Sequence, residues 1–198
     1  MNQIAHCMKM ATDDIAPPLQ SATELARFLA LLNMYDVKSY LEIGARYGGT
    51  FEAVMNRLPR GSRGVAIDFP GGEFGEDGSA GVLVNTIKRL RSRELDAHVI
   101  FGPSAAPEVV ERAKRAGPYD LIFIDGDHSY EAVKRDFELY SPIGRIIALH
   151  DIAADDDWTN KAGRKVEVGR FWREISKEYK TLEIVAPGAQ MGIGVIFK

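Results

Sequence analysis

Residues 39–50 read SYLEIGARYGGT, and this stretch decides the fold. Its first five residues, 39–43, form a short apolar run that predicts a buried strand. Gly44 allows a tight turn directly after the strand, and Gly48 allows the chain to approach a ligand closely. A helix expected at 50–58 presents its N-terminus to the same place. The stretch therefore predicts a strand, a glycine-rich turn and a helix that hold a nucleotide-like cofactor in an α/β domain.

Strand-like and helix-like patterns alternate along nearly the whole chain. Ser21 and Glu24 have the spacing of a capping box at the start of a first helix that extends to about Leu32. Residues 121–124 are all apolar, as expected of a central parallel strand that is buried on both faces. The expected strands are 39–43, 64–68, 97–101, 121–124, 145–149, 182–185 and 193–197, and the expected later helices are 50–58, 82–93, 107–116, 130–140 and 168–179.

The connection between the last two strands contains Pro187 and Gly188 and is too short for a helical crossover. These two strands should therefore pair antiparallel. The glycine-rich segment 69–80 predicts a mobile loop. The expected fold is a three-layer, doubly wound α/β domain, with a mostly parallel seven-stranded sheet and an antiparallel C-terminal hairpin. We expect residues 1–20 to be an N-terminal arm and 21–198 to be a single domain.

Composition and charge exclude several classes of function. The 198-residue chain has a net charge of -3 and shows no basic stripe, so nucleic acid is not expected as its main partner. Its single cysteine, Cys7, cannot form an intrachain disulfide and indicates a reducing compartment. No apolar run approaches the length of a membrane span, and residues 1–20 lack the apolar region of a secretory signal. No membrane association is expected, and the expected location is the cytoplasm.

Asp68 ends the second expected strand, where ligands bind in a doubly wound sheet. Its carboxylate can accept hydrogen bonds from ribose hydroxyls. Taken singly, the glycines could serve only to turn the chain, and Asp68 could serve only as a cap. Together, at a separation of roughly 20 residues, they favour an adenosine-type cofactor. Arg46 stands where the dinucleotide fingerprint G-x-G-x-x-G needs its second glycine, which argues against a pyrophosphate site.

The pattern E-x-G-x-x-x-G at 42–48 resembles motif I of the class I S-adenosylmethionine-dependent methyltransferases, whose Rossmann-like fold also ends in an antiparallel strand pair. The segments FIDGDHSYE at 123–131 and LHDI at 149–152 are similar to the methyltransferase 24 branch, which resembles the cation-dependent O-methyltransferases. The resemblance extends from Ser39 to Phe197 and also implies a possible homodimer. The residues that it implies for S-adenosylmethionine binding are Glu42, Gly44, Ala45, Gly48, Asp68, Ser104 and Asp125.

Two aspartates predict a metal site at the same edge of the sheet. Asp125 and Asp151 end the fourth and fifth strands, which we expect to be neighbours about 4.8 Å apart. Their carboxylates repel each other unless a proton or a cation lies between them, and oxygen ligands suit Mg²⁺ or another divalent cation. The related enzymes usually have Asn after the second Asp, where this chain has Ile152. A third ligand could come from Asp127, His150 or a carboxylate at 155–157, or the metal could be absent.

His128 follows Asp125 at a strand-to-helix turn and is the candidate general base for a substrate hydroxyl. The competing interpretation is a residue at the start of a helix that binds a carbonyl group. His150 directly precedes Asp151. Because side chains alternate along a strand, only one of these two should face the site, and we expect it to be Asp151.

Ser104 matches the position at which the related enzymes contact the adenine ring, and it could instead cap the helix at 106–116. Trp158 could form a wall of the substrate pocket, or it could pack back onto the fold. The function predicted from these residues is cation-assisted O-methylation of a small hydroxylated molecule by S-adenosylmethionine. The alternatives are a non-catalytic domain that binds S-adenosylmethionine and a nicotinamide-dependent oxidoreductase. The sequence does not identify the acceptor.

Overall fold

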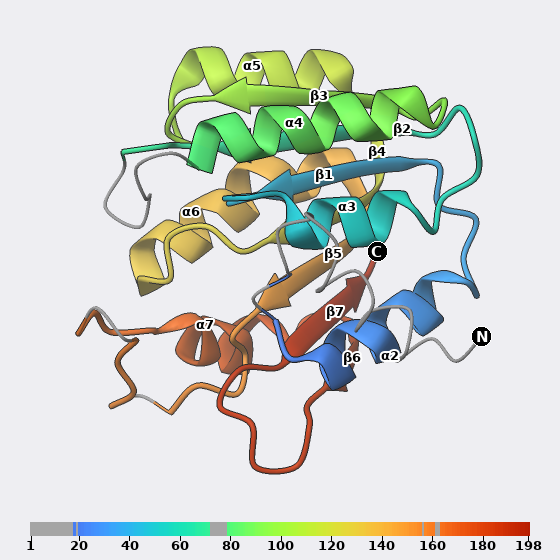
Figure 1. Ribbon diagram of the computed structural model, residues 1–198. Helices are drawn as coiled ribbons and strands as arrows, with labels where there is room; N and C mark the ends of the chain where they lie inside the picture. Colours follow the sequence, from blue (N-terminus) through green and yellow to red (C-terminus); the bar gives the residue numbers. More distant parts are fainter. Residues whose placement is uncertain (1–17, 19, 72–78, 156, 161–162) are drawn as a thin grey trace.

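The computed structural model describes residues 18, 20–71, 79–155, 157–160 and 163–198. The expected N-terminal arm and the expected mobile loop lie mostly outside these residues. Figure 1 shows a central sheet with helices on both faces, as predicted for a three-layer α/β fold. No helix among the described residues is long and apolar enough to cross a membrane.

Within the described residues, seven strands form one sheet in the order β3-β2-β1-β4-β5-β7-β6. The first five strands run parallel, and β7 pairs antiparallel with both β5 and β6. The predicted mostly parallel sheet and its C-terminal hairpin are therefore confirmed. The strands are β1 (Ser39–Ile43), β2 (Arg63–Asp68), β3 (Asp96–Phe101), β4 (Tyr119–Ile124), β5 (Gly144–His150), β6 (Lys180–Ile184) and β7 (Ile193–Phe197).

The helices divide between the two faces of the sheet, and each group covers its own hydrophobic core cluster. One face carries α2 (Ala22–Leu32), α3 (Gly49–Met55) and α4 (Ser79–Ser92), and the other carries α5 (Pro107–Ala116), α6 (Tyr130–Tyr140) and α7 (Val168–Ile175). The short 3₁₀ helix η1 (Ser141–Ile143) precedes β5.

Side chains of the same strand pack in different core clusters. Tyr40 packs in the cluster under α2, α3 and α4, whereas the neighbouring Leu41 and Ile43 pack in the cluster under α5, α6 and α7. This follows from the alternation of side chains along a strand. A strand whose two faces are both covered is apolar on both, which explains the uninterrupted apolar run 121–124 in β4.

Three predicted helix boundaries differ from the structure by three or four residues. The third helix, α3, ends at Met55 rather than at residue 58, and α7 ends at Ile175 rather than at 179. Helix α4 begins at Ser79, so the predicted loop is shorter than expected. Tyr179 still packs against the core and lies edge-on to Phe137, because the chain beyond α7 continues along the same surface.

The predicted capping box is not formed. The side chain of Ser21 makes no capping hydrogen bond, and Glu24 is fully buried. The carboxylate of Glu24 instead accepts hydrogen bonds from the N–H groups of Ala186 and Gly192, at 2.8 and 3.2 Å. Glu24 therefore fixes the connection between β6 and β7, which lies far away in the sequence.

The parallel strands end level with one another. Ile43 of β1 pairs with Ile67 of β2 and with Ile124 of β4, and Ile124 pairs with Leu149 of β5. The residues that follow these positions therefore meet at one edge of the sheet. This register is what brings the functional candidates together.

Candidate cofactor and active site

A cavity of about 820 Å³ extends along the carboxyl ends of the parallel strands. Most of the residues predicted to act in the site line it. They are Glu42, Gly44, Ala45, Asp68, Ser104, Asp125, His128 and Asp151. The loops after β1, β2, β3, β4 and β5 therefore all contribute to one site, as a doubly wound sheet requires.

Gly44 makes the tight turn that the sequence predicts. Its φ of +86° lies in the left-handed region, and a Cβ atom at this position would lie 2.1 Å from the carbonyl oxygen of Asp125. The N–H of Gly44 donates to Ile67 O at 2.9 Å, and the N–H of Asp125 donates to Ile43 O at 2.9 Å. Only glycine fits between the turn and the end of β4 in this arrangement.

Gly48 has a different reason for being glycine. It has a φ of +85° at the N-cap of α3, and a Cβ atom there would lie 2.9 Å from the side chain of Leu83 and 3.0 Å from that of Thr86, both in α4. Gly48 is not among the residues that line the cavity. It therefore allows α3 and α4 to pack closely, and its predicted contact with the cofactor receives no support from this position.

Arg46 and Asp68 connect the turn after β1 to the end of β2. Arg46 has a φ of +47°, which is unusual for a residue with a long side chain, and its N–H donates to Asp68 Oδ1 at 2.8 Å. Burial raises the pKa of Asp68, against the opposing effect of this hydrogen bond and of the Arg46 charge. Asp68 therefore stabilises the turn and also lines the cavity, so both interpretations of this residue are compatible with its position.

Glu42 lies at the floor of the cavity and is only 1% exposed. Its carboxylate accepts a hydrogen bond from the Tyr40 hydroxyl. Burial raises the pKa of Glu42 well above its usual value, and the charges of Asp125 and Asp68 act in the same direction. The cavity floor therefore combines several acidic groups that a cationic ligand would stabilise.

Ser104 lines the cavity, and its hydroxyl donates to Asp136 Oδ1 at 2.7 Å. The N-cap of α5 is Ala106, which has no side-chain capping bond, so the capping role considered for Ser104 is not seen. Burial raises the pKa of Asp136 to about 6, although the hydrogen bond from Ser104 opposes this change. The Tyr140 hydroxyl donates to the carbonyl oxygen of Ser104 at 2.5 Å. These contacts fix the loop after β3.

Asp125, Asp151 and two histidines form one buried cluster. His150 Nδ1 lies 3.0 Å from Asp125 Oδ1 and 3.2 Å from Asp151 Oδ1. His128 Nδ1 lies 2.8 Å from Asp151 Oδ2, and His128 Nε2 lies 4.0 Å from Asp125 Oδ1. The structure therefore brings the predicted residues together and adds His150 to them.

The expectation that His150 turns away from the site is wrong. Strand β5 continues to His150, but Asp151 then adopts a left-handed conformation with a φ of +61°. This turn interrupts the alternation of side chains, so both residues reach the site. Aspartate tolerates the left-handed region better than most residues.

The two histidines have raised pKa values. Burial opposes a charge on His128, but the hydrogen bond to Asp151 and the charges of Asp125 and Asp151 raise its pKa above the ordinary value. Burial likewise opposes a charge on His150, but Asp125, through its charge and hydrogen bond, together with the charges of Asp151 and Glu24, raises its pKa to about 9. The cluster thus contains both negative and positive groups.

Several cavity residues were not predicted. Gln20, from the expected arm, donates from Nε2 to Asp125 Oδ2 at 2.5 Å and accepts a hydrogen bond from the Thr50 hydroxyl. Trp158 lines the cavity and also packs against the core, so both interpretations of it apply. Further residues at the cavity wall are Arg46, Asn160, Arg164 and Met191.

The donor groups do not fit the predicted Mg²⁺ ion as they are arranged. Among the described residues, no group of three or more His, Cys, Asp or Glu side chains could hold a metal ion. Ile152, at the position of the usual third ligand, is buried in the apolar core. Asp125 and Asp151 instead contact nitrogen atoms of Gln20, His128 and His150.

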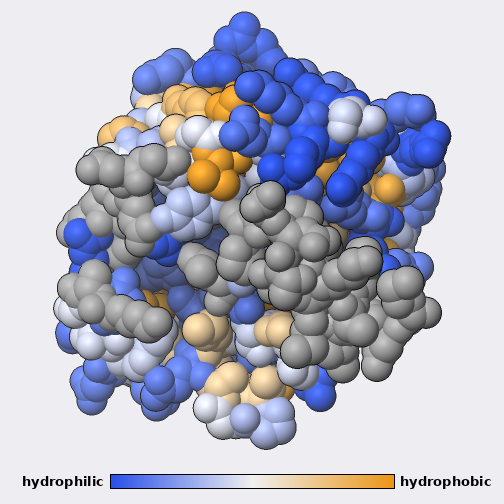
Figure 2. All heavy atoms as spheres, viewed as in Figure 1, coloured by the Kyte–Doolittle hydropathy of each residue, from blue (hydrophilic) through white to orange (hydrophobic). Residues whose placement is uncertain are grey.

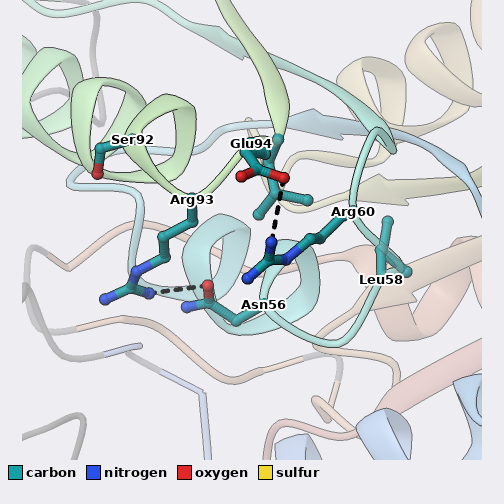
Figure 3. A pocket seen from close by; sticks show the side chains of 7 residues that line it. Asn56, Leu58, Arg60, Ser92, Arg93 and Glu94 are labelled. Carbon is teal, nitrogen blue, oxygen red and sulfur yellow. Dashed lines mark hydrogen bonds and ion pairs between the residues drawn. The ribbon is translucent and has the colours of Figure 1, made fainter.

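A smaller cavity of about 400 Å³ lies at the other end of α3 and α4 (Figure 3). Its charged groups already have partners. Arg60 contacts Glu94 at 3.2 Å, and Arg93 donates to Asn56 at 2.8 Å. This cavity contains none of the predicted functional residues, so we assign the site to the larger cavity.

The chain is similar to known proteins in sequence and in fold. A family model described as a methyltransferase domain, the methyltransferase 24 family, matches residues 41–152. No curated protein matches the sequence.

Solved structures share the fold at low sequence identity. An O-methyltransferase from Bacillus cereus in complex with SAH is 19% identical, with a TM-score of 0.68, and the match covers 99% of this chain and 90% of that one. A putative caffeoyl-CoA O-methyltransferase from Staphylococcus aureus is 17% identical, with a TM-score of 0.69 and coverage of 100% and 93%. TomG, an O-methyltransferase from Streptomyces achromogenes involved in tomaymycin synthesis and solved with SAM, is 16% identical, with a TM-score of 0.66 and coverage of 100% and 89%.

The family model matches more than half of the chain, and the fold and the strand-end cavity agree with it. This chain therefore belongs to the methyltransferase 24 family of class I S-adenosylmethionine-dependent methyltransferases.

Proposed function

We propose that this protein transfers a methyl group from S-adenosylmethionine to a hydroxyl group of a small molecule. The observation that carries the proposal is the hydrogen bond between His128 Nδ1 and Asp151 Oδ2, at 2.8 Å, in the cavity that also contains the glycine turn after β1. A base oriented by a carboxylate beside a cofactor site is the arrangement needed to deprotonate an acceptor hydroxyl.

The cofactor half of the cavity is formed by the turn at Gly44 and by the ends of β2 and β3. Asp68 lies where a carboxylate can accept hydrogen bonds from ribose hydroxyls, and Ser104 lies on the neighbouring loop. Phe69 also lines this half and is 50% exposed, so it offers an apolar surface for a planar base. Figure 2 shows hydrophobic side chains gathered near the start of α4, on this side of the molecule. Bound here, S-adenosylmethionine supplies an electrophilic methyl group.

The acidic floor of the cavity suits a positively charged cofactor. Glu42, Asp68 and Asp125 all line it, and Glu42 is fully enclosed. A sulfonium cation bound near these carboxylates would lower their mutual repulsion. This charge pattern favours S-adenosylmethionine over a nicotinamide dinucleotide, whose pyrophosphate is negative.

His128 is the residue that removes the acceptor proton. With the Nδ1 proton donated to Asp151, Nε2 is the nitrogen that accepts a proton in the neutral ring. Asp151 fixes the orientation of the ring and stabilises the charge that it acquires. A well-placed general base contributes about 10²–10⁴ in rate.

The acceptor half of the cavity is lined by Trp158, Asn160, Arg164 and Met191. A cavity of about 820 Å³ lies within the range of about 300–1,000 Å³ that is usual for small-ligand sites. The combination of an aromatic ring, an apolar thioether and polar side chains suits a small, partly planar hydroxylated molecule. The sequence-based expectation of a divalent cation is not used in this mechanism, because the donor set does not fit one.

The proposal is tested by incubating the protein with methyl-labelled S-adenosylmethionine and a panel of catechols, phenols and sugars. His128→Gln should lower the transfer rate by about 10²–10⁴. His98→Gln, at an exposed position in β3, is the matched control and should keep the wild-type rate. A His128→Gln variant that transfers methyl groups at the wild-type rate would contradict the assignment of the base.

A further inference from the structure

His150 occupies the space between the two strand-end aspartates. Its Nδ1 atom lies 3.0 Å from Asp125 Oδ1 and 3.2 Å from Asp151 Oδ1. Nδ1 forms a hydrogen bond with Asp125 Oδ1, whereas Asp151 Oδ1 accepts no hydrogen bond and is attracted to the ring only when the ring is protonated. A ring nitrogen that can carry a positive charge therefore lies where a bridging cation would have to lie.

The other carboxylate oxygens also face nitrogen atoms. Gln20 Nε2 donates to Asp125 Oδ2 at 2.5 Å, and His128 Nδ1 lies 2.8 Å from Asp151 Oδ2. Mg²⁺ requires nearly octahedral oxygen ligands at about 2.0–2.1 Å. Three of the four carboxylate oxygens face nitrogen donors instead, and these donors would have to move away for a cation to bind. The fourth, Asp151 Oδ1, accepts no hydrogen bond and lies at ion-pair distance from His150 Nδ1.

The backbone keeps His150 in this position. His150 is the last residue of β5, it pairs with Ile193 of β7, and it is only 6% exposed. The following Asp151 has the left-handed conformation that turns its carboxylate back toward the same imidazole. Two like charges at this depth are costly unless a neighbouring group compensates them, and the imidazole is the group that does so.

We infer that His150 replaces the divalent cation: its imidazole, hydrogen-bonded to Asp125 and ion-paired with Asp151, holds the two aspartates together, and the protein works without a metal ion. The inference deepens the proposed function and rests on it for its kinetic part. His150 is a positioning residue, since it acts by keeping the Asp151 carboxylate oriented toward His128.

The first test measures metal binding and does not depend on methyl transfer. Free Mn²⁺ is followed by electron paramagnetic resonance during titration into the wild-type protein with S-adenosylhomocysteine present. We expect no stoichiometric binding by the wild type. His150→Asp places a third carboxylate in the cluster and should bind one Mn²⁺ ion, whereas the exposed control His98→Asp should behave like the wild type.

Stoichiometric Mn²⁺ binding by the wild type, displaced by Mg²⁺, would overturn the inference. So would a His150→Asp variant that shows the wild-type circular dichroism spectrum and binds no Mn²⁺. The second test compares the wild-type transfer rate in EDTA with the rate in Mg²⁺, and we expect the two to be equal. If no acceptor is methylated at all, the proposed function fails, while the Mn²⁺ titration still decides whether His150 has replaced the cation.

Discussion

Replacing Gly44 by alanine should disrupt the cofactor site more than any other single-methyl change. The added Cβ would lie 2.1 Å from the carbonyl oxygen of Asp125 and 2.6 Å from the Cα of Gly126, whereas ordinary contacts begin near 3.4 Å. The turn and the end of β4 must therefore separate by about 1 Å, and a misplacement of that size can cost about 10²-fold in function. The left-handed conformation adds about 1–2 kcal/mol for alanine, and the overlap adds about 1–3 kcal/mol.

For a chain of this length, a loss of about 2–5 kcal/mol lowers Tm by about 4–20 °C. Gly61→Ala is the matched control, because Gly61 has a φ of +79° but no atom lies within 4 Å of the added Cβ. The control should lose about 1–2 kcal/mol, or about 2–8 °C, and should bind S-adenosylhomocysteine like the wild type. The assays are thermal denaturation and isothermal titration calorimetry. If Gly44→Ala binds S-adenosylhomocysteine as tightly as the wild type does, the assignment of this turn to the cofactor is refuted.

Three further predictions concern the base, the loop after β3 and the acceptor. Asp151→Asn removes the Asp151 charge, which raises the pKa of His128 against the effect of burial, so the rise of kcat/KM with pH should move to lower pH. The rate at neutral pH should nevertheless fall about 10²-fold, because Asp151 no longer stabilises the charge that the His128 ring acquires. An unchanged pH profile would contradict the pairing. Burial raises the pKa of Asp136 from 3.8 to about 6, so the folded protein holds this proton more tightly than the unfolded chain does. The resulting stabilisation is fully present below pH 3.8 and is lost as the pH rises through 6. Asp136→Asn, which can still accept the bond from Ser104, should therefore stabilise the protein at pH 8 by up to about 3 kcal/mol and much less at pH 4, as measured by urea unfolding; an equal effect at both pH values would exclude this cause. Trp158→Ala should raise the KM for the acceptor and leave that for S-adenosylmethionine unchanged in steady-state kinetics, and a change confined to the cofactor KM would place Trp158 in the other half of the cavity.

The strand-end residues could be predicted because they depend on local patterns. An apolar run followed by glycine marks the end of a buried parallel strand, and in a doubly wound sheet all such ends meet at one edge. This reasoning placed Gly44, Asp68, Asp125 and Asp151 in one site, and the register of the sheet shows why it succeeded.

The residues that were missed or misread depend on contacts that local patterns do not encode. Glu24 matched a capping box, but its partners lie more than 160 positions away. Gln20 reaches Asp125 across 105 positions, and no motif marks it. His150 was excluded by the alternation rule, which holds inside a strand but fails where Asp151 takes a positive φ. Gly48 was expected to allow the chain to approach a ligand closely, but its close neighbours are Leu83 and Thr86 of α4.

Calorimetric titration of the wild-type protein with S-adenosylhomocysteine and, separately, with NAD⁺ tests the central claim most directly. We expect the cavity at the carboxyl ends of the strands to bind one S-adenosylhomocysteine per chain and no detectable NAD⁺, because its turn carries Arg46 in place of the glycine that a pyrophosphate needs. Binding of NAD⁺ without S-adenosylhomocysteine would contradict the assignment of this cavity to methyl transfer.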